Sequence, residues 1–151
     1  MAEAARDLWP PDIDVKSVVP PVVILREQAS LLAERTRSLV RGEVESEEKL
    51  AESVEQYLTD ALKPENRIEY KHTLVLVTPA LESYRYVLLS VRHDFQPYPC
   101  RAVFHPDPTW DIEGESSLPN EQEFVGWLKH MLARPETKRV IQALLYQAQE
   151  S

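Results

Sequence analysis

The feature that most constrains the fold is a stretch of three apolar runs, residues 67–105, in which two proline-bearing turns separate the runs. Apolar and polar side chains alternate through the start of the first run, residues 67–77, which is typical of a strand with one buried face. Val75 and Val77 break the alternation, so the far end of this strand is expected to be covered on both sides. The six residues that follow include Pro79 and are too few for a helical crossover. The second run, residues 84–93, must therefore return antiparallel to the first as a hairpin.

A second turn leads from this hairpin into a short third run, residues 100–105. Pro97 and Pro99 in the turn have no N–H to donate to a ladder, so the third strand is expected to begin at a sheet edge. If the hairpin closes at the centre of the turn, His93 lies directly opposite Cys100 and both side chains point to the covered face. The three runs together predict a three-stranded antiparallel meander.

The alternation also predicts which side chains occupy each face of the meander. Leu74, Val87 and Leu89 are assigned to the face that helices cover. The opposite face is expected to carry five sizeable apolar or aromatic groups: Val75, Val77, Tyr84, Tyr86 and Leu88. A monomer rarely leaves that much apolar surface open, so another part of the chain, a partner or a second copy must cover it. We expect a homodimer through this outer sheet face.

Two helices are predicted ahead of the meander. Pro20 and Pro21 suit a first helical turn, and the apolar spacing after them predicts a helix to about Arg41. Gly42 is interpreted as the stop of that helix. Residues 43–67 are rich in glutamate and keep helical spacing, which predicts a second helix, although its first three residues can instead extend as a strand.

The first of these helices is locally basic. Its four arginines are Arg26, Arg35, Arg37 and Arg41. The simplest interpretation is a solvated face with cations near the helix C-terminus, where they stabilise the helix dipole. The alternative is a site for an anion or an acidic partner.

A loop at residues 107–118 and two further helices are predicted after the meander. Asn120, with an acidic residue three positions later, has the pattern of an N-cap with a capping box, and Phe124 begins apolar spacing at i, i+3, i+4 and i+7. Pro135 restarts a last helix after a link so short that the two helices must form a hairpin or a corner. The expected fold is a two-layer α+β domain, residues 20–151, with a three-stranded antiparallel meander, two helices before it and a helical hairpin after it.

Residues 1–19 show no periodicity and contain two proline pairs, so they are predicted to form an extended N-terminal arm. Leu8, Trp9 and Ile13 are the groups able to hold the arm in place. Trp9 can anchor it on its own domain, which is the interpretation we favour, or on a partner.

Composition narrows the classes of function. The formal net charge of −8 argues against binding nucleic acid through phosphate neutralisation. One cysteine rules out an intrachain disulfide and a cysteine-rich zinc site. The sequence has neither an apolar run long enough for a membrane helix nor the order of a signal peptide, so the chain is expected to be cytoplasmic and not membrane-bound.

The best catalytic candidate is Cys100 with His93. An imidazole beside a thiol can lower the thiol pKa and create a nucleophile, as in cysteine enzymes. The more ordinary interpretation is a small buried cysteine beside a hydrogen-bonded core histidine. A register slip of one residue would also separate the two side chains onto opposite faces.

The sequence gives less support to a metal site than to a site at Cys100 and His93. The four histidines, His72, His93, His105 and His130, form none of the HxH, HxxxH or HExxH patterns. His72 and His93 share a predicted face of the sheet, but two cross-strand residue pairs separate them along the ladder. That separation is too large for both side chains to bind one zinc ion. Glu69 and Lys71 resemble the E-x-K half of a metal-dependent nuclease site, yet an ordinary ion pair explains them equally well. We predict no metal and no cofactor.

The sequence favours a non-catalytic protein-interaction domain, such as a small acidic accessory, immunity-type or assembly subunit. The expected interaction residues are the aromatic and apolar groups left without an internal role: Trp9, Tyr84, Tyr86, Leu88 and Tyr98. The alternatives are a small enzyme at Cys100 and His93, or a degenerate nuclease site at Glu69 and Lys71. Partners are predicted to be a protein or a second copy of the chain, and not nucleic acid or membrane.

Overall fold

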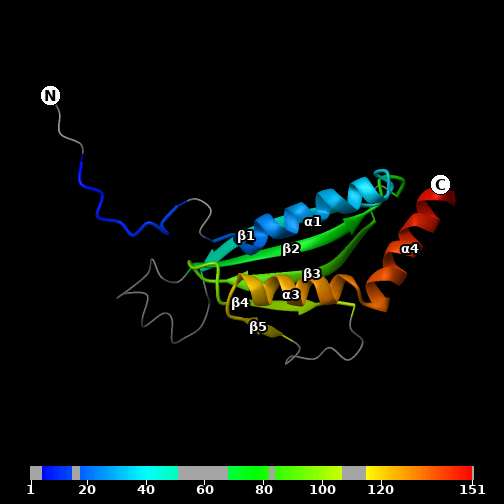
Figure 1. The fold of residues 1–151 in the computed structure, drawn as a ribbon. Coiled ribbons are helices and arrows are strands. Elements are labelled where there is room, and N and C mark those ends of the chain that lie inside the picture. The colour runs from blue at the N-terminus through cyan, green and yellow to red at the C-terminus, as the bar shows by residue number, and fades with distance from the viewer. Residues whose placement is uncertain (1–4, 15–17, 51–67, 82–83, 107–114, 151) are drawn as a thin grey trace.

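The computed structural model describes residues 5–14, 18–50, 68–81, 84–106 and 115–150. Within these residues, one antiparallel five-stranded sheet is covered on one face by helices, which confirms the α+β class (Figure 1). In chain order the elements are α1 Pro21–Arg35, β1 Arg41–Leu50, β2 Ile68–Val77, β3 Arg85–His93, β4 Cys100–Phe104, β5 Ser116–Leu118, α3 Glu121–Leu132 and α4 Pro135–Glu150. Each strand pairs with the next one along the chain, so the whole sheet is a meander.

The three predicted strands are the centre of this sheet, as β2, β3 and β4. His93 pairs with Cys100 in the β3–β4 ladder, as the turn length predicted. The short strand β5 was not expected, because it falls within the segment interpreted as a loop and is only three residues long. Its Leu118 nevertheless joins the core beside Cys100.

The predicted second helix is wrong over its first part. Residues 41–50 form the edge strand β1, which pairs antiparallel with β2 along its full length. The remainder of that predicted helix, residues 51–67, lies outside the described residues. From Glu43 to Glu47 every second residue is a glutamate, which is the periodicity of a strand. Pairing with β2 overrides the helical preference of glutamate.

The first predicted helix ends six residues early, at Arg35. The Thr36 hydroxyl accepts a hydrogen bond from the Val40 N–H at 3.2 Å and lies 2.9 Å from the Leu32 carbonyl oxygen. Arg37 and the next residue have φ of 53° and 64°, so the chain reverses through the left-handed region and enters β1.

Gly42 is not a helix stop but the point where β1 passes close to α1. A Cβ built on Gly42 would lie 2.8 Å from the Ala29 Cβ and 2.9 Å from the Ala29 Cα. Distances this short leave no room for a methyl group. The missing side chain therefore lets the helix pack directly on the edge strand.

The two C-terminal helices form as predicted. The Asn120 side chain accepts a hydrogen bond from the Glu123 N–H at 2.9 Å and caps α3. Between the helices, the buried Thr137 hydroxyl donates to the Met131 carbonyl at 2.8 Å and fixes a corner. From this corner α4 runs toward the side of the molecule where α1 ends (Figure 1).

A β-bulge changes the predicted sheet faces. The register shifts between Leu74 and Val75, so Leu74 pairs with Leu89 whereas Val75 pairs with Val87. Leu88 is 1% exposed and belongs to the core under the helices, whereas Val87 is 41% exposed. The predicted faces are therefore wrong for Val87 and Leu88, and correct for Leu74 and Leu89.

Tyr86 also lies on the helix-covered face. It pairs with Leu76, a core residue, and packs against the core cluster. The outer face consequently lacks Tyr86 and Leu88, two of the five groups that the homodimer prediction rested on. Val75, which remains on that face, is fully buried among its neighbours.

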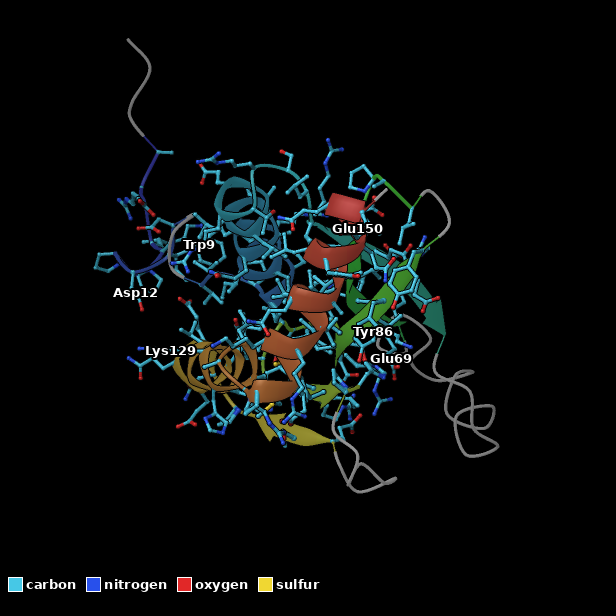
Figure 2. All side chains as sticks on the ribbon, turned by 90° about the vertical axis from the view of Figure 1, so that its right-hand side faces the viewer. Trp9, Asp12, Glu69, Tyr86, Lys129 and Glu150 are labelled. Atoms are coloured by element: carbon cyan, nitrogen blue, oxygen red, sulfur yellow. The ribbon has the colours of Figure 1, made fainter. Side chains whose placement is uncertain are left out.

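The N-terminal arm does not pack on its own domain through its tryptophan. Trp9 is 75% exposed, and Leu8 and Ile13 are 86% and 60% exposed, so the favoured interpretation of a docked arm is wrong (Figure 2). The arm leaves the molecule at the end where α1 begins (Figure 1). Among the described residues, no helix has the length and apolar character needed to cross a bilayer.

Candidate functional site

An apolar groove of about 550 Å³ lies on the helix-covered side of the described surface. α1 forms one wall, α3 forms the other, and the first turns of α4 close one end through Thr137 and Ile141. The floor is the sheet itself, where Leu74, Leu76 and Leu88 line the groove. A volume of this size is within the range of about 300–1,000 Å³ that is usual for binding cavities.

The groove exists because the two helices carry apolar residues beyond their core-facing stripes. Leu31 on α1 and Val125 on α3 both line it, although they are 47% and 43% exposed. Deeper in the walls, Ala29 and Leu128 are buried against the sheet. The result is a continuous apolar surface that runs from the core to solvent, which is typical of a recognition site.

The charged groups that line this groove are both cations. Arg35 lies on the α1 wall and Lys129 on the α3 wall, and among the described residues no carboxylate lines the groove. Neither cation belongs to an ion pair within the described part of the chain. In a chain of net charge −8, this gives the groove a local preference for an apolar group that carries negative charge.

A second candidate group lies on the same face of the sheet and consists of two buried histidines that are in contact. The Nε2 atoms of His72 and His93 are 3.0 Å apart. His72 Nδ1 is 2.8 Å from the Ser46 hydroxyl oxygen, and His93 Nδ1 is 2.7 Å from the Asp94 carbonyl oxygen. The Tyr70 ring stacks on His93 with a centroid separation of 5.4 Å.

The hydrogen-bond partners fix the direction of this chain when both rings are neutral. A carbonyl oxygen only accepts, so His93 Nδ1 carries a hydrogen and His93 Nε2 is the acceptor. His72 Nε2–H must then donate to it, and His72 Nδ1 accepts from the Ser46 hydroxyl. Ser46, His72 and His93 therefore form one directed chain that ends on the Asp94 carbonyl.

Burial, together with the nearby His93 and Arg26, lowers the pKa of His72 to about 4. The ring is therefore neutral at neutral pH, as the directed chain requires. The expectation that His72 and His93 are too far apart to share a ligand is wrong, because the diagonal pair reaches across the ladder. Among the described residues, however, no three potential ligands gather around a metal position.

Cys100 is fully buried, and burial raises the pKa of its thiol to about 11. At neutral pH the sulfur is a protonated thiol, which is a poor nucleophile. His93 stands opposite in the ladder, but its two nitrogens bond to His72 and Asp94. The pair is together as the register predicted, in an environment that stabilises the neutral thiol.

Glu69 has an ion-pair partner on β3. Its Oε1 lies 3.4 Å from Nη1 of Arg92, and Glu115 also contacts Arg92, with Oε2 3.1 Å from Nε. Hydrogen bonding to Glu115 is the main reason why the pKa of Arg92 is raised. Lys71 pairs with Arg92 across the ladder, so the arrangement around Glu69 is cationic rather than a cluster of metal-binding carboxylates.

The predicted interaction residues do not share one surface. Trp9 lies in the arm, Tyr84 is 44% exposed before β3, and Leu88 forms part of the groove floor. Tyr86 is partly buried against the core, and the Tyr98 hydroxyl donates to the Val19 carbonyl at 2.8 Å.

The groove residues Leu31 and Val125 were missed by sequence reasoning. Their signal was an apolar residue beside, rather than on, the main stripe of each helix. No protein-family model, curated protein or solved structure matches this chain.

Proposed function

We propose that this protein is a non-catalytic protein-interaction domain and that the groove between α1 and α3 is its binding site. The observation that carries the proposal is an apolar cavity of about 550 Å³ whose wall residues Leu31 and Val125 remain exposed. Arg35 and Lys129 on opposite walls define the partner's chemistry as an apolar segment flanked by acidic residues. Full burial of one such apolar side chain is worth about 1.5–3 kcal/mol.

The catalytic alternatives lack a comparable observation. A thiol pKa of about 11 disfavours Cys100 as a nucleophile, and the Arg92 guanidinium beside Glu69 leaves no cluster of carboxylates for magnesium.

Site-specific photo-crosslinking tests the proposal. A photoreactive amino acid at Leu31 places the probe in the groove, and the same amino acid at Val23 provides the matched control. Val23 lies on the same helix and is 38% exposed, but it does not line the groove. In cells of the source organism, we expect a discrete cross-linked polypeptide from position 31 and none from position 23. Equal labelling from both positions, or none from position 31, would contradict the proposal.

A further inference from the structure

We propose that the groove binds the N-terminal arm, residues 5–14, of a second copy of this chain. This inference rests on the proposed function, because it names the partner of the same groove. The result would be a homodimer held by two reciprocal arm–groove contacts and not by the outer sheet face.

The arm has the apolar groups that such a partner needs. Leu8, Trp9 and Ile13 are 86%, 75% and 60% exposed, so three large apolar side chains stand open within six residues. A tryptophan beside a leucine is the type of anchor that commonly dominates binding energy at interfaces. The groove is roomy enough for these groups and ends on a floor of leucines.

The arm also has a local shape of its own. The Ile13 N–H donates to the Pro10 carbonyl at 3.1 Å, and the Trp9 N–H donates to the Asp7 carboxylate at 3.0 Å. Pro10 and Pro11 further restrict the backbone. A segment that is already restricted loses less conformational entropy when it docks.

The charges of arm and groove are complementary. The arm carries three carboxylates, Asp7, Asp12 and Asp14, against one cation, Arg6. The described lining of the groove presents Arg35 and Lys129 and no carboxylate. With Trp9 in the groove, Asp7 and Asp12 flank the anchor on either side in sequence. Carboxylates so placed can meet cations on the two walls, whereas most of the surface of this acidic protein would repel them.

A second copy is the occupant that fits the arrangement of a single chain. The arm leaves at the end where α1 begins (Figure 1). The groove lining extends along α1 from Ile24 to Arg35 and reaches α4 at Thr137 and Ile141. In one chain Trp9 is exposed and the groove is open. Reciprocal exchange fills both grooves and covers both arms, and its two-fold symmetry closes the assembly at two copies.

Sedimentation velocity of the full-length chain provides the first test. We expect a dimer for the wild type and a loss of affinity of at least about tenfold for Trp9→Ala and for Leu31→Glu. Val23→Glu, on α1 outside the groove, and Val87→Lys, on the outer sheet face, should leave the dimer unchanged. A monomeric wild type at high micromolar concentration overturns the inference. So does a dimer that Val87→Lys disrupts and Trp9→Ala does not.

Mixing the two defective variants gives the decisive result. Trp9→Ala retains an intact groove and Leu31→Glu retains an intact arm, so only their mixture contains one complete arm–groove contact. We expect each variant alone to be monomeric and the mixture to form a heterodimer weaker than the wild-type dimer. A mixture that stays monomeric overturns the inference, as does an arm that occupies the groove of its own chain.

A charge exchange provides a test that remains available if Leu31→Glu fails to fold. Lys129→Glu alters an exposed side chain, and we expect it to weaken the dimer at least about threefold, with Asp12→Lys on the same chain restoring part of the loss. The absence of any effect from Lys129→Glu, together with no effect from Arg35→Glu, overturns the inference.

Cross-linking from position 31 separates this inference from the proposed function. A cross-link to residues 5–14 of another copy supports both. A cross-link only to a different protein leaves the proposed function intact and refutes the arm as occupant. No cross-link refutes both.

Discussion

Replacing His72 by glutamine should remove a defined part of the pH dependence of folding. Burial lowers the pKa of His72 from 6.5 to about 4. The unfolded chain therefore binds more protons than the folded chain between these values, and stability falls as pH falls. The contribution is fully present above pH 6.5 and is lost below about pH 4. A shift of that size corresponds to about 3 kcal/mol in total, most of which is lost between pH 7.5 and 4.5.

Urea denaturation of both proteins at half-unit pH intervals from 7.5 to 4.5 measures this contribution. Ionisable groups away from His72 are the same in both proteins, so their effects cancel in the difference between the two free energies of unfolding. We expect the advantage of the wild type over His72→Gln to shrink by about 2–3 kcal/mol as the pH falls. His130→Gln is the matched control, because it makes the same substitution at an exposed histidine on α3. A difference that stays constant within about 0.5 kcal/mol would refute a buried neutral His72.

Three further predictions concern the core. Gly42→Ala should destabilise the fold by about 1–3 kcal/mol in chemical denaturation, because the new methyl group would collide with Ala29, whereas Gly126→Ala, with open space around it, should not. Leu88→Lys should unfold the protein or lower the free energy of unfolding by at least about 4 kcal/mol, whereas Val87→Lys should lower it by less than about 1 kcal/mol. The reverse order would show that Val87 is buried and Leu88 exposed, as the sequence predicted. The single cysteine should react slowly with a thiol reagent under native conditions, at a rate insensitive to pH between 6 and 8. Rapid labelling with an apparent pKa below about 8.5 would instead favour Cys100 as a nucleophile.

Periodicity predicted the elements whose apolar pattern agreed with their final environment. The central strands alternate clearly, and α3 repeats its apolar residues at i, i+3 and i+4 from Phe124. The edge strand β1 was not predicted as the main interpretation because its outward positions are glutamates, which favour helix when no partner strand is considered. Long-range pairing with β2, which no local pattern reveals, decides its structure.

One bulge decides which residues the candidate site contains. Strict alternation through β3 put Leu88 on the face opposite Leu89, whereas the register shift beside Leu74 brings both under the helices. A shift of one residue exchanges the two faces of a strand, so the same chemical pattern describes either an apolar outer face or the floor of a groove.

The histidine chain depends on the same kind of geometry. The sequence placed His72 and His93 on one face but separated them by two ranks, although imidazoles reach diagonally across a ladder. Ser46 could join them only once β1 became a strand, because it pairs with His72 in the β1–β2 ladder. His72 therefore obtains its Ser46 partner from β1, the strand that the sequence did not predict as the main interpretation. For the same reason, substituting Ser46 should affect the histidine chain without changing the groove, whose lining does not include β1.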